Sequence, residues 1–317
     1  KGIRIGGDLI LAPGVTKDVT LVDCVIQGNI RNYGTGEVRF EAPQITPEST
    51  ATKPSEVYKP GATLDRTLEY GGKTVPIYRD RPLNVFSDVD FIWTGEENEN
   101  QRRLEYLGGE FRTRYGIDVS SFQGEIDWDA VADDNIDFAM VRVGFRGTGT
   151  GSLNTDKYYE QNIRGAMRAG LETGVYFFAQ AVTVEEAIEE ADYVISLLDG
   201  LDINGPVAYD WEMHDSTYRV YGTSPEMATA CAVAFCERIK DAGYTPMVYG
   251  GTYVTYMKYD QGALADYLSW YPEYKSEKSE KLCPTLVYHM DYWQFSSSRA
   301  VAGINGRVDM NIQFIRR

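Results

Sequence analysis

The sequence predicts an α/β protein, an irregular TIM-like β/α barrel preceded by a small β-rich N-terminal region. After about residue 114, strand-like and helix-like segments alternate over roughly 200 residues, which is typical of a parallel sheet with helical crossovers. Before that point, short apolar runs are separated by turn residues instead. We therefore expect two domains, a β-rich region of unknown role at residues 1–113 and a barrel at residues 114–317.

The N-terminal region reads as short strands and turns. Apolar and polar residues alternate over residues 1–41, which predicts strands. Residues 42–62 carry four prolines among serine, threonine and glutamate, and predict a linker or a long surface loop. Strand signals return at Thr67–Tyr70 and Thr74–Tyr78, and Gly71-Gly72 between them predicts a hairpin. No repeat of roughly 20–50 residues is evident.

The barrel region supplies strands and helices in turn. The predicted strands are Tyr115–Val119, Phe138–Val143, Gly174–Phe178, Pro206–Glu212 and Tyr244–Tyr249. The predicted helices are Asp156–Ala169, a helix opened by a capping box at Thr183-x-x-Glu186, and a helix from Ser224-Pro225 to about Asp241. Residues 285–314 hold several strand-like runs and no helical pattern, so the closing strands should lack helices.

Composition excludes several classes of function. Lys and Arg number 31 against 47 for Asp and Glu, a net charge of −16 that argues against a nucleic-acid partner or an anionic membrane surface. No apolar run is long enough to span a bilayer. The chain begins Lys-Gly-Ile-Arg without an apolar signal core, so we expect that a signal was removed or lies upstream, as in a secreted or wall-associated protein.

Cysteine and histidine are too scarce for several common sites. Four cysteines do not make a disulfide scaffold, and Cys231 falls on the apolar stripe of a predicted helix. With only His214 and His289, a histidine-rich zinc site or a Ser-His-Asp triad is not expected, and both are interpreted as surface or loop residues. No cofactor and no metal ion are implied.

Asp210 and Glu212 are the most informative residues of the chain. They close an apolar strand, in which side chains two positions apart project to the same face with Cα atoms roughly 6.5–7 Å apart. Ionising one of two such carboxyl groups raises the pKa of the other, which is how an enzyme can keep one acid protonated near neutral pH. The alternative for this tripeptide alone is a strand end with two solvated acids.

Further candidates are found at the carboxyl ends of other barrel strands, where such folds carry their chemistry. Asp118 ends the first strand, and Asp309 lies in the last strand-like run. Four acids at one barrel mouth would be costly unless a reaction or a cation required them. The aromatic and amide residues near these positions are Tyr176, Phe178, Gln180, Tyr249, Trp270, Trp293 and Gln294. They are candidates to stack on or hydrogen-bond a sugar, and core filling is the alternative for each aromatic.

Four segments carry a resemblance to a known family. They are Tyr115–Gly124 (YGIDVSSFQG) with Ile126-Asp127-Trp128, Gly174–Phe178 (GVYFF), Asp210-Trp211-Glu212, and Trp293–Ser298 (WQFSSS) with Val301–Asn311 (VAGINGRVDMN). In this order they resemble glycoside hydrolase family 25, the lysozyme-like N-acetylmuramidases, over about residues 114–317. Phe122 stands where the family often has histidine or another polar aromatic, and Arg299 stands where glycine is common. Residues 1–113 are not covered.

The resemblance implies a modified β/α barrel that cleaves the β-1,4 bond between N-acetylmuramic acid and N-acetylglucosamine in peptidoglycan. By the same resemblance, Glu212 is the general acid/base and Asp210 assists the acetamido group of the substrate as it attacks the anomeric carbon. The remaining implied site residues are Asp118, Asp309, Gln294 and Tyr176, to which the residue pattern adds Tyr249, Trp270 and Trp293. Glycan strands are the implied partner, and no protein partner is inferred.

Two other functions stay open at this point. One is a catalytically silent glycan-binding barrel, which a Glu212→Gln variant that matches the wild type in activity would favour. The other is a metal-dependent hydrolase that uses the same acids as ligands of a hard cation, which activity in the presence of a chelator would exclude.

Overall fold

The computed structural model describes residues 52–61, 63–95 and 102–317, together with residues 3–5, 9–11, 16–22, 24–26, 30–32, 35 and 38–41. Two compact units are present, Lys1–Ala51 and Thr52–Arg317. The sequence predicted a boundary near residue 113, whereas residues 52–113 lie in the same compact unit as the barrel.

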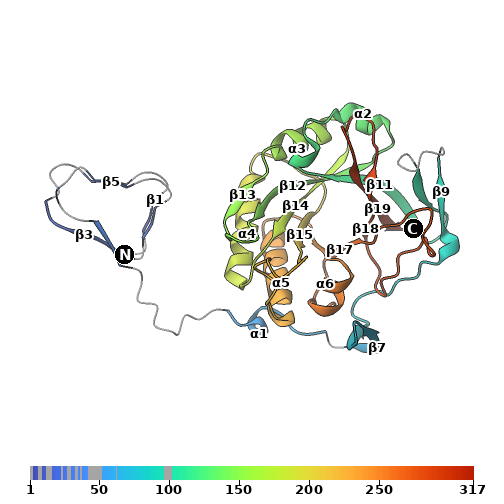
Figure 1. The fold of residues 1–317 in the computed structure, drawn as a ribbon, viewed down its shortest axis with the longest axis horizontal. Helices are drawn as coiled ribbons and strands as arrows, with labels where there is room; N and C mark the ends of the chain where they lie inside the picture. The colour runs from blue at the N-terminus through green and yellow to red at the C-terminus, as the bar shows by residue number, and fades with distance from the viewer. Residues whose placement is uncertain are drawn as a thin grey trace. The chain divides into compact units, whose positions relative to one another are not determined.

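In the described residues of the first unit, six short strands pair in parallel (Figure 1). The pairs are β1 (Ile3–Ile5) with β4 (Cys24–Ile26), β2 (Leu9–Leu11) with β5 (Ile30–Asn32), and β3 (Val19–Val22) with β6 (Val38–Glu41). Paired residues lie 21, 21 and 19 positions apart, so two successive coils of chain place equivalent strands side by side, as in a β-solenoid. The sequence predicted the strands but not this repeat.

Eight strands of the second unit close into a barrel. In spatial order they are β11 (Phe111–Val119), β12 (Phe138–Arg146), β14 (Glu172–Ala179), β15 (Val207–Trp211), β16 (Pro246–Tyr249), β17 (Leu268–Pro272), β18 (Tyr292–Arg299) and β19 (Val308–Arg316). Neighbours from β11 to β18 run parallel, and β19 runs antiparallel to both β18 and β11. A short strand β13 (Leu153–Thr155) pairs with β12.

Helices lie on the outside of the barrel along part of its circumference (Figure 1). They are α2 (Trp128–Asp133), α3 (Tyr159–Arg168), α4 (Val184–Leu197), α5 (Pro225–Asp241) and the short α6 (Thr252–Met257). Within the described residues, no helix connects β17 to β18 or β18 to β19, which confirms the irregular closure expected from the sequence. None of the helices in these residues has the length and apolar character needed to cross a bilayer.

Helix capping follows the sequence with one difference. Ser224 accepts a hydrogen bond from Met227 N with Pro225 in the first turn, as predicted for α5. Thr183 caps α4 through Glu186 N. The Glu186 carboxylate, however, accepts from Val182 N rather than from the cap residue, because its other contacts turn it towards an arginine. The expected capping box is therefore only half formed.

Residues 52–113 wrap part of the barrel with α1 (Pro54–Val57), the hairpin β7 (Leu64–Tyr70) and β8 (Lys73–Tyr78), the 3₁₀ turn η1 (Asp88–Asp90), and the hairpin β9 (Phe91–Thr94) and β10 (Arg103–Tyr106). Gly71 and Gly72 both have positive φ, as the predicted two-residue turn requires. Arg81 is buried and donates to Gln261 Oε1 and to the carbonyls of Leu264 and Tyr267. This segment is thereby hydrogen-bonded into the barrel wall.

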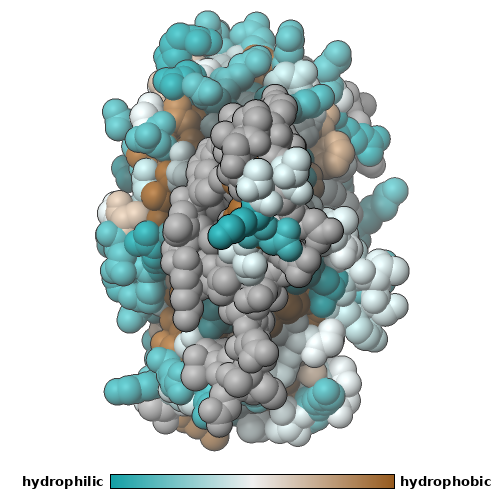
Figure 2. Space-filling model, turned by 90° about the vertical axis from the view of Figure 1, so that its left-hand side faces the viewer, coloured by the Kyte–Doolittle hydropathy of each residue, from teal (hydrophilic) through white to brown (hydrophobic). Residues whose placement is uncertain are grey.

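Two packed regions fill the barrel unit. A small cluster inside the barrel includes Met140, Ala208, Met247, Trp270 and Tyr292. A larger cluster lies between the strands and the covering helices, and Cys231 and Cys236 of α5 are buried in it, as predicted for Cys231. On the side drawn in Figure 2, hydrophilic residues cover much of the visible described surface and hydrophobic ones form small separate groups.

Candidate active site

A cleft of about 320 Å³ opens at the barrel mouth where the parallel strands end. Because β19 is antiparallel, its first residues meet the carboxyl ends of its neighbours, and Asp309 pairs in register with Asp118. Eight of the nine predicted site residues line the cleft: Asp118, Asp309, Asp210, Glu212, Tyr176, Tyr249, Trp270 and Gln294.

Trp293 is the predicted residue that lies elsewhere. It is fully buried outside the barrel wall, donates to the carbonyl of Glu273 at 3.0 Å, and its ring contacts Phe91. Side chains alternate along a strand, so the adjacent Gln294 faces the cleft and Trp293 cannot. A substrate contact for Trp293 is therefore wrong.

The Asp210–Glu212 pair lies as the strand spacing predicted, with unequal burial. Asp210 is 5% exposed on β15, between Phe178 and Tyr249 of the neighbouring strands, whereas the Glu212 side chain is 25% exposed just beyond the strand end. Burial first, and then the charge of Glu212, raises the pKa of Asp210 well above its ordinary range. Among the described residues, Asp210 Oδ1 has no hydrogen-bond partner.

Glu212 has two neighbours that the sequence did not assign to it. Gln180 Nε2 donates to the Glu212 carbonyl at 2.8 Å and so fixes the end of the strand. His214 Nε2 lies 2.9 Å from Glu212 Oε2, with the His214 side chain 62% exposed. His214 is indeed a loop residue, but its position two residues after Glu212 was the signal that it could reach the carboxylate.

Asp118 of β11 and Asp309 of β19 form a second carboxyl pair in the cleft. Burial, and then the charge of Asp309, raises the pKa of Asp118 well above its ordinary range. Burial also raises the pKa of Asp309, to about 6. Asp118 Oδ2 accepts one hydrogen bond from Gln294 Nε2 and one from Asn311 Nδ2, each at 2.8 Å. Asn311 was not predicted, although it lies two positions after Asp309 and hence on the same face of β19.

The aromatic residues of the cleft mostly serve its polar groups. Trp270 is only 3% exposed, and its indole N–H donates to Asn311 Oδ1 at 2.8 Å. Tyr249 and Tyr274 both donate their hydroxyl hydrogen to Gln294 Oε1. Phe122, by contrast, is 85% exposed at the cleft, with the Arg142 guanidinium 5.2 Å from its ring centroid. Among these aromatic residues, Phe122 and the 54% exposed Tyr274 are largely open to solvent.

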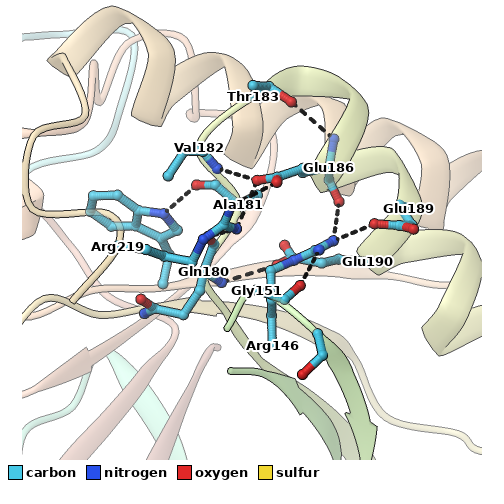
Figure 3. Close-up of polar contacts among 12 residues, drawn as sticks. Arg146, Gly151, Gln180, Ala181, Val182, Thr183, Glu186, Glu189, Glu190 and Arg219 are labelled. Carbon is cyan, nitrogen blue, oxygen red and sulfur yellow. Dashed lines mark hydrogen bonds and ion pairs between the residues drawn. The ribbon is translucent and has the colours of Figure 1, made fainter. Parts of the chain in front are cut away.

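A buried network behind the cleft holds the β14–α4 turn (Figure 3). Arg146 Nε donates to the fully buried Glu190, which also accepts from Gln180 N. Arg219, on the loop that follows Glu212, donates to Glu186 and to the Gln180 carbonyl. Burial raises the pKa of Glu190 to about 7. The turn that carries Gln180 is thus tied to two arginines, one on each side.

In the part of the chain that the structure describes, no group of three or more His, Cys, Asp or Glu side chains is arranged to hold a metal ion. The cleft acids can share protons within two carboxyl pairs and offer an unpartnered carboxylate oxygen to a hydrogen-bond donor.

The sequence of the barrel is similar to those of known proteins. The family model for glycosyl hydrolases family 25 matches residues 117–304. The autolytic lysozyme of Clostridium acetobutylicum is 26% identical over 197 residues, which are 62% of this chain and 54% of that protein. The chain therefore spans about half the length of that curated relative.

Two solved structures have a similar fold. The bacterial lysozyme from Streptomyces coelicolor aligns with a TM-score of 0.51 at 25% identity, covering 62% of this chain and 90% of that one. The spore cortex lytic enzyme SleM of Clostridium perfringens aligns with a TM-score of 0.54 at 23% identity, covering 63% of this chain and 67% of that one.

Proposed function

The chain belongs to glycosyl hydrolases family 25, and from this premise we propose that it is a lysozyme-type peptidoglycan hydrolase. The bond it cuts is the β-1,4 linkage between N-acetylmuramic acid and N-acetylglucosamine. Its partner is the glycan strand, and its place of action is the cell wall, as the name of the autolytic relative suggests. The observation that carries the proposal is the cleft in which Asp210 and Glu212 form one carboxyl pair and Asp118 and Asp309 another.

Unequal burial explains how the first pair divides its work. In the unliganded protein, the proton shared by the pair rests on the more deeply buried Asp210, whose pKa is raised. Its Oδ1 atom has no partner among the described residues and can accept the N–H of a substrate acetamido group. An ionised carboxylate accepts that hydrogen bond best, so binding the substrate favours transfer of the proton from Asp210 to Glu212.

Glu212 then acts as the general acid. It gives its proton to the glycosidic oxygen as the bond to the anomeric carbon breaks, and the acetamido oxygen, oriented by Asp210, bonds to that carbon. Water next attacks the same carbon, Glu212 takes up the proton of that water, and the acetamido group is released. Net retention at the anomeric carbon follows from the two successive displacements. This sequence of steps rests on the family resemblance together with the positions of the two carboxyl groups.

The test is digestion of purified peptidoglycan by the wild type and by Glu212→Gln, with mass spectrometry of the reduced fragments. We expect the wild type to release muropeptides that end in reduced N-acetylmuramic acid, and Glu212→Gln to lose activity by at least about 100-fold. Glu280→Gln removes an equivalent charge from an exposed glutamate outside the cleft, and it should retain full activity.

Each alternative has its own result in this assay. Fragments that end in N-acetylglucosamine would contradict the proposed bond. Full activity of Glu212→Gln would contradict the role of Glu212, and no release from several wall types would favour a binding protein. Repeating the digestion with a chelator addresses the metal-dependent hydrolase: we expect unchanged activity, and loss of activity that added metal restores would favour that class instead.

A further inference from the structure

The hydrogen bonds to Asp118 show which of its two carboxyl oxygens accepts from neighbouring side chains. Its Oδ2 atom accepts from the side-chain amides of Gln294 and Asn311, both at 2.8 Å. An amide can bond through either its N–H₂ or its oxygen, so its orientation must be set by a third group. Each of the two amides has such a group.

The orientation of Asn311 is set by Trp270. An indole N–H can only donate, so the atom of Asn311 that lies 2.8 Å from Trp270 Nε1 must be the amide oxygen. The N–H₂ group of Asn311 is thereby directed at Asp118. Both residues are buried, Asn311 completely and Trp270 to 3% exposure, which excludes competing water from this link.

Gln294 is oriented by two hydroxyl groups, which can accept as well as donate and so direct its amide less strictly than the indole directs Asn311. Tyr249 and Tyr274 donate to Gln294 Oε1 at 3.2 and 3.1 Å. The Gln294 N–H₂ group is then left for Asp118, and it also lies 3.5 Å from Asp309 Oδ2. Two independent sets of donors thus converge on one oxygen of one carboxyl group.

We propose that Trp270 and Asn311 are positioning residues, which turn Asp118 so that Oδ2 faces the amides and Oδ1 carries the proton. This inference rests on the proposed function and deepens it. An oxygen that already accepts two N–H groups has little capacity left for a hydrogen of its own. Asp118 therefore acts as a neutral hydrogen-bond donor, and the negative charge on this side of the cleft belongs to Asp309.

The proton balance of the cleft supports this assignment. Burial raises the pKa of Asp118 well above its ordinary range, whereas that of Asp309 rises only to about 6, and the hydrogen bond from Asp118 lowers it. Asp309 is thus the member of the pair that ionises near neutral pH. A charge fixed on Asp309 can stabilise the oxocarbenium-like centre, and Asp118 holds that carboxylate in place.

The chain offers a matched pair of variants as a test. Trp270→Phe removes the indole N–H that orients Asn311 and keeps an aromatic ring. Trp293→Phe removes an equivalent buried N–H, one that donates to a backbone carbonyl outside the cleft. We expect Trp270→Phe to lower kcat on peptidoglycan by about 10-fold with KM within about two-fold, and Trp293→Phe to leave both unchanged. Thermal unfolding of both variants checks that they fold.

A second measurement does not depend on catalysis. The titration of the Asp118 carboxyl carbon, followed by ¹³C NMR, should move to higher pH in Trp270→Phe than in wild type, because the ionised form loses a well-directed donor. In Trp293→Phe it should not move. Equal kcat in the two variants together with an unmoved Asp118 titration would overturn the proposal. If the wild type releases no fragments, the proposed function fails, and the Asp118 titration alone decides whether Trp270 and Asn311 position this carboxyl group.

Discussion

The burial of each carboxyl side chain, more than whether it belongs to Asp or Glu, determines its role in the cleft. Asp118 and Asp210 are 6% and 5% exposed and have pKa values raised well above the ordinary range of aspartate, whereas the Glu212 side chain remains 25% exposed. Burial disfavours the ionised form, and a proton on a buried aspartate lowers the repulsion among four neighbouring acids.

The raised pKa of Asp118 makes the stability of the fold depend on pH. The pKa of Asp118 is raised in the folded state, so its contribution is fully present below the ordinary carboxyl pKa of about 4 and is lost as the pH rises through the folded value. Asp118→Asn resembles the protonated acid and does not ionise. The melting temperature of Asp118→Asn minus that of the wild type should therefore increase from pH 4 to pH 8. Thermal unfolding of both proteins at several pH values measures this difference. Asp199→Asn, at an exposed position, is the control, and an equal pH trend in the two variants would contradict this linkage.

Most of the site could be predicted from the sequence, because the two-residue period of the strands places its chemically reactive residues on the same face. Asp210 and Glu212 share a face by the two-residue period, and the same period places Asp309 and Asn311 together. The prediction failed at Trp293, where two adjacent residues were both assigned to the cleft although alternation allows only one. The contact of His214 with Glu212 and the hydrogen bond from Asn311 to Asp118 were not predicted: the spacing in the sequence allowed both, but it does not specify how the side chains are oriented.

Single elements were predicted where their local signals were strong. The strands and helices around the barrel and the Gly71-Gly72 hairpin all formed as expected. The parallel pairing of β1–β6 and the role of Arg81 escaped prediction, because both depend on contacts between residues distant in sequence. His289 lies outside the helices and strands, as expected for a loop residue, and its ring stacks on Phe111 at 5.0 Å between ring centroids, a contact that the sequence did not predict.

The β14–α4 turn depends on a buried ion pair and gives a prediction at the scale of an element (Figure 3). Arg146→Met leaves Glu190 buried without its cation, which should cost about 3–5 kcal/mol of unfolding free energy. The loss should be smaller at pH 5 than at pH 8, because Glu190, with a pKa raised to about 7 even beside Arg146, is protonated at the lower pH. Urea unfolding at both pH values measures it.

A double variant separates the lost charge from lost packing. Arg146→Met combined with Glu190→Gln removes the uncompensated carboxylate, and most of the loss at pH 8 should be recovered. If the double variant is no more stable than Arg146→Met, the cost arises from the hydrogen bonds of Arg146 to Gly151 and Glu186 carbonyls rather than from the buried charge.

At the scale of the whole molecule, the barrel cannot be separated from residues 52–113. Besides the bonds of Arg81, Phe86 lies 4.4 Å from Phe314 between ring centroids, and Gly61 N donates to Asp260. A Cβ at Gly61 would lie 2.9 Å from the backbone of Gly262, so the chain segments are in close contact there. The division between compact units falls after Ala51 instead.

Two deletions test this organisation. Removal of residues 1–51 leaves the second unit intact, so its melting temperature and its activity on soluble glycan fragments should match those of the full chain within error. Removal of residues 1–113 strips the core of Phe86, Phe91, Phe111 and Leu104, all buried or packed against it, and takes Arg81 from its carbonyl partners. That loss of apolar burial is comparable to the net stability of an ordinary domain, so we expect no cooperative unfolding transition.

The shorter deletion also tests wall anchoring without damage to the barrel. Weaker binding to sacculi, with unchanged activity on fragments, would assign anchoring to residues 1–51. Unchanged binding would exclude that role. A fully folded and active chain that begins at residue 114 would contradict the boundary after Ala51 and restore the one that the sequence predicted.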